Sequence, residues 1–403
     1  MSTAVAFMGD LQEAKRPGIL VGGGAHKARA AIMAFALQHS IPVFRTWNAL
    51  DVATDDHMCY AGTVGTYGGP GRNFGIQNCD LLLILGCRIS GRITGGTPAT
   101  FARGAKRYWV DVDSGLLAEH EVKPHVAVCA DAGEFIAECT RGYFADWKLN
   151  FTGWLERNMV LVGKYDPVEP DKHLYPWHHY GFMRELSHAL PANAIVTYDT
   201  GGNAIMMGHC FKSKAGQRIF SSNGNSAMGF AMCGAIGAWF AEPQRPIICI
   251  IGDGGFQLNS QECQTLVHYK IPVKVFILNN KILGNTLAYQ IQNGKAQIAC
   301  SPEGGYSSPD FQKLASAYGI ENYGLGEWSR FDHVVGSALN STGPVIVDVL
   351  HERFCDYRPR MSLWDGGVEE MYPPLPDDEF TGNMIIPPVD GWQERRKRYK
   401  DIK

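Results

Sequence analysis

The sequence predicts an α/β protein with two doubly wound domains, each built on a parallel sheet. Runs rich in Val, Ile and Leu stand at 81–85, 247–251 and 345–350; they are too short for helices, and Asp348 is their only charged residue. Strands buried on both faces of a parallel sheet have this composition. Segments of helical spacing alternate with these runs, and glycine or polar residues follow several of them directly. This alternation is typical of doubly wound α/β domains.

Composition narrows the class of protein. A chain of 403 residues favours about two or three domains. The formal charge of −3 gives no general attraction to nucleic acid or to an anionic membrane, so neither is expected as a partner. No run approaches the roughly 18 apolar residues that a transmembrane helix needs. Eleven cysteines are scattered without CxxC pairs, which favours reduced thiols and a cytoplasmic protein.

The first domain is expected over 17–146, after a short polar lead-in at 1–16. A long glycine-rich loop is expected at 61–75. The turn Gly22-Gly23-Gly24 could suggest a nicotinamide fingerprint, but it does not fit GxGxxG and the next strand ends without a ribose-binding acid. A plain strand-to-helix turn explains it equally well. The expected elements are strands at 18–21, 41–44, 81–85 and 107–112 and a helix at 27–39.

A connector is expected at 147–175, because this segment has mixed composition and two prolines between 166 and 170. The second domain follows at 176–356. The tail, 357–403, is rich in proline, aromatic residues and acids, and could cover an active-site mouth or dock a subunit. The expected elements of the second domain are helices at 180–190 and from Gly229, and strands at 194–198, 247–251, 273–278 and 345–350.

Chemistry is expected where two strands of the second domain end. Gly252-Asp253-Gly254-Gly255 follows one strand and Asn279-Asn280 the next. The carboxyl ends of parallel strands share an edge of the sheet, and ligands of such sheets bind there. Glycines let backbone N–H groups approach a phosphate, while Asp and Asn oxygens suit a small cation. The sequence therefore predicts a metal–diphosphate site, although a glycine turn beside a capped strand end is the plain alternative.

A second local signal concerns the helix that follows. Asn259 and Glu262 fit a capping box, which predicts that the helix begins just beyond the glycines.

The pattern GDG, twenty-four residues, then NN resembles the thiamine-diphosphate signature of the acetolactate synthase and pyruvate decarboxylase superfamily. The resemblance implies thiamine diphosphate and Mg²⁺ as cofactors. It implies Asp253, Asn280 and the carbonyl of Ile282 as metal ligands, and Met228 as the support of the bent thiamine, although a lone methionine is more often core filler. The implied cofactor-binding residues are Gly202, Asn203, Ser226, Met228, Gly252, Asp253, Gly254, Gly255, Asn280, Ile282, Gly284 and Asn285.

The implied substrate pocket differs from that of acetolactate synthases. Asn285 and Thr286 replace a methionine and a valine after the glycine, and Tyr289 replaces a tryptophan. The pocket has gained polar groups, so we expect the acceptor to differ from a second simple 2-keto acid.

The first domain resembles the central domain of the same enzymes, in the segments RPGILVGGGA, CDLLLILGCRISGRITGG and FARGAKRYWVDVDS. That domain binds FAD in many members, while others keep the fold with ADP or with no flavin. FAD therefore stays an open possibility here. The positions that would match its binding residues are Gly23, Gly86, Arg88, Arg92, Asp111 and Asp113.

The resemblance covers the central and diphosphate-binding domains and leaves out the pyrimidine-binding domain, which carries the catalytic glutamate of the family. Either a partner subunit supplies that domain, in an expected heterotetramer, or the chain is part of a longer protein. The implied function is that of a thiamine-dependent carboligase subunit, which decarboxylates a 2-keto acid such as pyruvate and transfers the acyl-anion unit to a carbonyl acceptor. A decarboxylase subunit and an inactive scaffold subunit are the alternatives.

Overall fold

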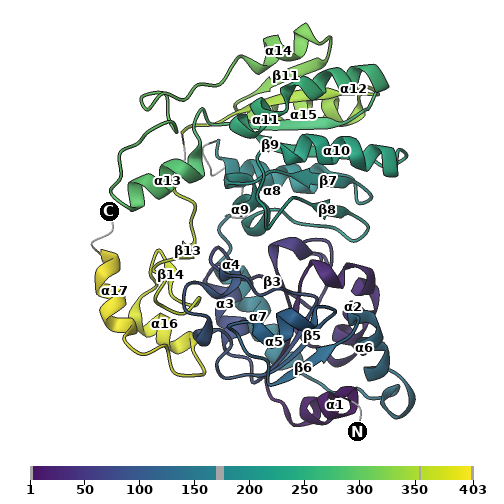
Figure 1. The fold of residues 1–403 in the computed structure, drawn as a ribbon, viewed down its shortest axis with the longest axis vertical. Coiled ribbons are helices and arrows are strands. Elements are labelled where there is room, and N and C mark those ends of the chain that lie inside the picture. Colours follow the sequence, from purple (N-terminus) through teal and green to yellow (C-terminus); the bar gives the residue numbers. More distant parts are fainter. Residues whose placement is uncertain (1–2, 169–176, 354, 401–403) are drawn as a thin grey trace. The chain divides into compact units, whose positions relative to one another are not determined.

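The computed structural model describes residues 3–168, 177–353 and 355–400. The chain forms two compact units (Figure 1). Unit 1 comprises Met1–Pro167 together with Arg358–Lys403, and unit 2 comprises Val168–Tyr357. The chain therefore leaves the first unit, builds the second and returns to the first.

Unit 1 contains a parallel sheet of six strands in the order β3-β2-β1-β4-β5-β6. The order reverses between β1 and β4, which is the point where doubly wound sheets bind ligands. The apolar run of β4 is buried along its whole length, as predicted for a strand covered on both faces. The strands are β1 (Pro17–Val21), β2 (Val43–Arg45), β3 (Tyr60–Thr63), β4 (Leu81–Leu85), β5 (Lys106–Asp111) and β6 (Val126–Cys129).

Helices cover both faces of this sheet. One core contains Phe7 and Phe135 from two helices that pack on the same face. The other contains Ile76 and Trp154 from helices on the opposite face. The helices of this part are α1 (Thr3–Glu13), α2 (Arg29–His39), α3 (Pro70–Gln77), α4 (Gly91–Thr94), α5 (Ser114–Glu119), α6 (Ala132–Cys139) and α7 (Thr152–Lys164).

Two predictions for unit 1 were wrong. Residues 1–16 are no polar lead-in, because α1 buries Phe7, Met8 and Leu11 in the core. The expected loop at 61–75 contains most of β3 and of α3. Every residue of α3 is buried, so packing against α7 stabilises a segment whose glycines and polar residues disfavour a helix.

The boundaries of the units also differ from the prediction. Helix α7, placed in the connector, packs against α3 and belongs to unit 1. Residues 169–175 of the expected connector lie outside the described residues. The tail returns to unit 1, where Asn73 Nδ2 donates to the carbonyl of Val368 at 2.7 Å. Its elements are β13 (Arg360–Met361), β14 (Met371–Tyr372), α16 (Asp377–Asn383) and α17 (Trp392–Lys400).

Unit 2 contains a second parallel sheet of six strands, in the order β11-β12-β10-β9-β7-β8. Strand β7 lies between β8 and β9, so the strand order of this parallel sheet reverses between β7 and β9. Two doubly wound domains were predicted, and the structure confirms them. The strands are β7 (Ile195–Tyr198), β8 (Arg218–Phe220), β9 (Ile247–Gly252), β10 (Lys274–Asn279), β11 (Glu321–Leu325) and β12 (Val345–Leu350).

The helix after β9 begins earlier than the predicted capping box allows. It starts at Asp253 itself and runs through the glycines. Asn259 caps no helix with its side chain, which donates instead to the carbonyl of Gly229 at 3.0 Å. The helices of unit 2 are α8 (His179–Ala189), α9 (Gly202–His209), α10 (Phe230–Ala241), α11 (Asp253–Leu258), α12 (Cys263–Tyr269), α13 (Gly284–Gln292), α14 (Phe311–Ala317) and α15 (Phe331–Asn340).

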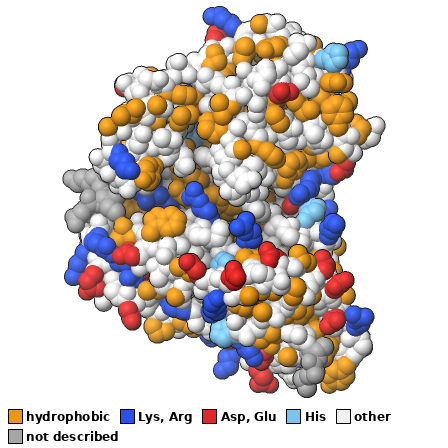
Figure 2. All heavy atoms as spheres, in the orientation of Figure 1, with side chains coloured by type: hydrophobic (Ala, Val, Ile, Leu, Met, Phe, Trp, Pro, Cys, Tyr) orange, Lys and Arg blue, Asp and Glu red, His pale blue; other side chains and the backbone are white. Residues whose placement is uncertain are grey.

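The surface charges, the cysteines and the hydropathy of the helices bear on the class of protein. Figure 2 shows acidic and basic side chains interspersed over the visible face of unit 1, while the visible face of unit 2 has fewer charges and several hydrophobic groups. All eleven cysteines are free. Within the described ranges, no helix combines the length and the hydropathy that crossing a membrane requires.

Candidate functional site

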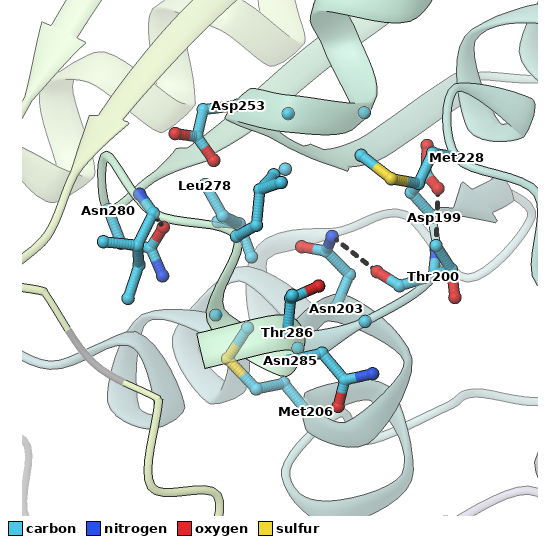
Figure 3. A pocket seen from close by; sticks show the side chains of 18 of the residues that line it. Asp199, Thr200, Asn203, Met206, Met228, Asp253, Leu278, Asn280, Asn285 and Thr286 are labelled. Atoms are coloured by element: carbon cyan, nitrogen blue, oxygen red, sulfur yellow. Dashed lines mark hydrogen bonds between the residues drawn. The ribbon is translucent and has the colours of Figure 1, made fainter. Parts of the chain in front are cut away.

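A pocket of about 300 Å³ lies in unit 2 at the carboxyl edge of the sheet, where β7, β9 and β10 end (Figure 3). Three segments form it, at 199–203, 252–255 and 280–286. Because β7 and β9 flank the point where the strand order reverses, the pocket occupies the usual ligand position of a doubly wound sheet. Its lining residues are Asp199, Thr200, Gly201, Gly202, Asn203, Met206, Ser226, Met228, Gly252, Asp253, Gly254, Gly255, Leu278, Asn280, Ile282, Leu283, Gly284, Asn285, Thr286 and Tyr357.

The glycines of the GDGG segment are required by close packing. A Cβ added at Gly254 would lie 2.4 Å from Cδ2 of Leu283, and one added at Gly255 would lie 2.8 Å from Oδ2 of Asp199. Any side chain at these positions would therefore push neighbouring groups into or out of the pocket. The glycines leave a wall of backbone that a phosphate can approach closely.

Asp253 is the central acidic group of the pocket. It is buried, and its Oδ2 accepts a hydrogen bond of 3.0 Å from the Tyr306 hydroxyl. Burial raises the pKa of Asp253 to about 6, although hydrogen bonds from Tyr306 and from nearby backbone N–H groups oppose the rise. In the described part of the chain no ion pair neutralises this carboxylate. A bound cation would supply the opposite charge that a buried carboxylate needs.

The segment after β10 lies against Asp253 and carries the side-chain oxygen of Asn280 (Figure 3). The amide N–H of Lys281 is among the hydrogen bonds that lower the pKa of Asp253, so the carboxylate lies against this segment. Asn280 Oδ1 accepts from the N–H of Ile282 at 3.3 Å. Figure 3 shows Asp253 and Asn280 bordering the same end of the pocket.

These residues fit a magnesium ion that is coordinated partly by the protein and partly by a phosphate. Among the described residues no group of three His, Cys, Asp or Glu could hold a metal by itself. An octahedral ion here would take one carboxylate, one amide oxygen and one carbonyl from the protein, and would need phosphate oxygens and water for the rest.

Met228 is held by contacts on both sides of Gly229. The N–H of Gly229 donates to Asp199 Oδ2 at 2.8 Å, and its carbonyl accepts from Asn259 at 3.0 Å. Gly229 has φ of 84°, a conformation that side chains disfavour. Burial raises the pKa of Asp199 to about 6. Because the residues that directly follow β7 and α11 fix Gly229 in this way, the adjacent Met228 has a defined place in the pocket wall.

Most predicted residues of this site meet in the pocket, and one does not. Asn285 and Thr286 line it from the first turn of α13. Tyr289 is absent from the lining, is 55% exposed, and its hydroxyl accepts from Lys295 Nζ at 3.1 Å. The helix carries Tyr289 one turn further on, outside the lining of this pocket, so its role at the substrate stays a prediction.

The structure adds residues that sequence reasoning did not assign. Asp199 and Thr200 occupy the end of β7, so the rule that found Asp253 could also have found them. Tyr357 packs against Gly202, where a Cβ would lie 2.3 Å from its hydroxyl oxygen. Tyr306 reaches Asp253 from 53 residues further along the chain, and no local pattern in the sequence marks it.

The positions predicted for FAD lie in unit 1, at the carboxyl ends of β1, β4 and β5. The two glycine turns touch, since the N–H of Gly24 donates to the carbonyl of Gly86 at 3.0 Å. Gly23 lies in the first of these turns. Asp113 caps α5 and donates its N–H to Asp111 Oδ1 at 3.1 Å, which gives both acids a structural role. Arg88 and Arg92 are exposed.

Fold and site together define a doubly wound α/β protein with a pocket suited to a diphosphate and a cation. Residues 6–139 match the family described as "Thiamine pyrophosphate enzyme, central domain", and 199–349 match "Thiamine pyrophosphate enzyme, C-terminal TPP binding domain". The chain therefore belongs to the thiamine pyrophosphate enzyme family and contains these two of its domains.

Similar curated proteins are acetolactate synthase large subunits. The chain is 33% identical over 365 residues to a "Probable acetolactate synthase large subunit" of Methanococcus aeolicus, with 84% of this chain and 58% of the relative covered. It is 32% identical over 350 residues to the protein of that name in Methanocaldococcus jannaschii, with the same coverage. The large subunit of acetolactate synthase isozyme 2 of Escherichia coli is 29% identical over 348 residues, with 84% and 60% covered. The chain thus spans somewhat over half the length of these relatives.

Proposed function

We propose that this chain is the diphosphate-binding part of a thiamine-dependent carboligase. It would bind thiamine diphosphate with Mg²⁺ and join the acyl unit of a 2-keto acid, pyruvate first among the candidates, to a carbonyl acceptor. The single observation that carries the proposal is the convergence of Asp253, Asn280 and Ile282 on one pocket walled by glycine backbone. The names of the acetolactate synthase relatives support the choice of reaction.

Each part of the pocket has a role in this proposal. Asp253, Asn280 and the Ile282 carbonyl hold the cation. Gly202 and Asn203, with the glycines after β9, contact the diphosphate, while Met228, Ser226 and Gly284 border the rings. Asn285 and Thr286 face the substrate. When bound, the cofactor supplies the carbon centre that accepts electrons during decarboxylation.

The proposal includes a partner. No glutamate is among the described residues that line the pocket. We propose that a pyrimidine-domain subunit supplies the catalytic glutamate in a cytoplasmic heterotetramer. That glutamate would be the positioned proton-transfer group of the reaction.

A flavin is the second proposed ligand. FAD or ADP would bind unit 1 near Gly23, Gly86 and Arg92, at the point where the strand order reverses. A visible absorption spectrum of the purified protein tests for FAD, because a bound flavin absorbs where the polypeptide and ADP do not.

Calorimetry of thiamine diphosphate uptake tests the core of the proposal. The full chain, with any partner it requires, should take up the cofactor only when Mg²⁺ is present. Asp253→Asn should weaken uptake at least about 100-fold, because it removes an anionic metal ligand. Glu242→Gln is the control, since it removes an exposed carboxylate paired with Arg245 outside the pocket. Uptake that ignores both Mg²⁺ and Asp253→Asn would contradict the proposal.

Product analysis separates the remaining alternatives. With pyruvate and a panel of aldehydes and ketones, a carboligase yields coupled hydroxyketones, whereas a decarboxylase yields free acetaldehyde. A scaffold subunit yields neither and need not bind the cofactor. Catalysis by the pure chain would refute the need for a partner.

A further inference from the structure

We propose that Tyr306, supported by Gln257, is a positioning residue that orients the metal-ligand carboxylate of Asp253. The inference rests on the proposed function. It adds to the site a side chain that is absent from the pocket lining and that lies outside the GDG and NN segments of the sequence. Because Tyr306 is not among the residues that line the pocket, it would act through Asp253.

The hydrogen bonds give the tyrosine hydroxyl a fixed direction. Gln257 Nε2 donates to the Tyr306 hydroxyl oxygen at 3.0 Å, so the hydroxyl's own proton is free for Asp253 Oδ2, also at 3.0 Å. Gln257 lies one turn after Asp253 on α11. The three side chains therefore form a chain of hydrogen bonds from Gln257 through Tyr306 to Asp253, and the carboxylate cannot rotate without breaking the last of them.

The loop that carries Tyr306 is tied to the other metal-ligand segment. Within the loop, the N–H of Tyr306 donates to the carbonyl of Ser301 at 2.9 Å, and the N–H of Ala299 donates to that of Gly304 at 2.7 Å. The N–H of Leu283, next to Ile282, donates to the carbonyl of Cys300 at 2.8 Å. Tyr306 thus links Asp253 to the segment that holds Asn280 and Ile282.

The chemistry of a tyrosine suits this task. A lysine or arginine would neutralise Asp253 and compete with the cation, whereas a phenol donates a hydrogen bond and leaves the negative charge in place. Groups that orient a ligand from outside the coordination shell tune metal affinity in this way.

The test is Tyr306→Phe, which removes only the hydroxyl. The concentration of Mg²⁺ that half-saturates thiamine diphosphate uptake should rise about tenfold. At saturating Mg²⁺ the affinity for thiamine diphosphate should stay within about twofold of wild type, because the metal restores the geometry at a cost in its own affinity. Gln257→Leu should shift the Mg²⁺ requirement in the same direction by a smaller factor.

Tyr323→Phe is the matched control. The Tyr323 hydroxyl also donates to a carboxylate, that of Glu321 at 2.5 Å, but it lies on the exposed edge strand β11. It should leave the Mg²⁺ requirement unchanged. An unchanged requirement in Tyr306→Phe would overturn the inference, and so would a loss of uptake that Mg²⁺ does not restore, since that indicates general damage. If the wild type itself needs no Mg²⁺, the proposed function fails first and the inference with it.

Discussion

At the scale of single residues, glycine packing and hydrogen bonds shape the pocket. Gly254 is flanked by Leu283 on one side and by Met228, whose Cε would lie 3.2 Å from an added Cβ. The Gly254→Ala variant should therefore displace the side chains that wall the pocket. We expect it to weaken Mg²⁺-dependent uptake of thiamine diphosphate about tenfold or more, and to destabilise unit 2 by about 1–3 kcal/mol through overpacking. Calorimetry and chemical denaturation measure the two effects.

The control for Gly254→Ala is a glycine with free space around it. Gly237 lies in α10, and nothing lies within 4 Å of a Cβ added there. Gly237→Ala should stabilise unit 2 by up to about 1 kcal/mol, because alanine favours the helix. Equal losses of uptake in both variants would show that the loss in Gly254→Ala does not come from packing around the pocket.

The same scale shows which site residues a sequence reveals. Asp253 and Asn280 stand directly after apolar strands, so the local pattern predicted them, whereas Met228 was predicted only from the family resemblance. Tyr306 has no such pattern, because its partner lies 53 residues earlier and only the folded loop brings the two together. Asn259 was misassigned as a helix cap because its hydrogen bond to Gly229, 30 residues earlier, is also a tertiary contact.

At the scale of elements, α1 is the clearest departure from prediction, and it can be tested. Phe7 is buried and packs against Phe35, Tyr108 and Phe135, with ring centroids 5.2 to 6.5 Å apart. Phe7→Ala should destabilise unit 1 by about 3–5 kcal/mol. Met159→Ala, which removes a half-exposed side chain on α7, should cost less than about 0.5 kcal/mol. Denaturant unfolding measures both, and a Phe7→Ala effect as small as the control would place α1 outside the core.

Elements differed in how well the sequence predicted them. The bounds of β4 and β12 were correct because short runs rich in Leu, Ile and Val, interrupted only by Asp348 in β12, leave few alternatives. Helix α3 was missed because its sequence, PGRNFGIQ, contains proline, two glycines and few helix formers. Its stability comes from burial, which includes the bond between Asn73 and Val368, 295 residues apart. Local propensity cannot report such support.

At the scale of the whole molecule, the tail that returns to unit 1 is part of its core. Glu370 and Arg395 form an ion pair of 2.6 Å whose side chains are almost fully buried. Glu369 accepts from Gln77 at 2.6 Å and pairs with Arg103. Removing one partner of such a pair leaves an uncompensated buried charge. The tail was expected to cover a surface or dock a subunit, yet these contacts make it a structural component of unit 1.

Unit 1 should also lose stability in mild acid, because the buried His39 must be protonated there. His39 is 1% exposed, and its Nδ1 accepts from the N–H of Leu149 at 3.1 Å. Burial lowers the pKa of His39 to about 4, below the value of 6.5 expected in the unfolded chain. The unfolded chain therefore binds the proton first. The stabilisation is complete above pH 6.5 and is lost as the pH falls towards 4, by about 3 kcal/mol at pH 4.

In unit 2, buried histidines and buried carboxyl groups have opposite effects on stability in acid. Burial lowers the pKa of His351 to about 3 and holds that of His179 well below 6.5, and both histidines act like His39. Burial also raises the pKa of both Asp199 and Asp253 to about 6. A carboxyl group with a raised pKa stabilises the fold at low pH and loses that contribution as the pH rises from about 4 to 6, so the two trends oppose each other. The pH dependence of unit 2 is therefore a balance of opposing groups, and the test follows the unfolding of unit 1 of the metal-free protein between pH 4 and 7. The variant His39→Asn, whose amide oxygen can still accept from Leu149, should remove most of the slope of unit 1 and none of that of unit 2. A slope that persists in this variant would assign the acid sensitivity to other groups.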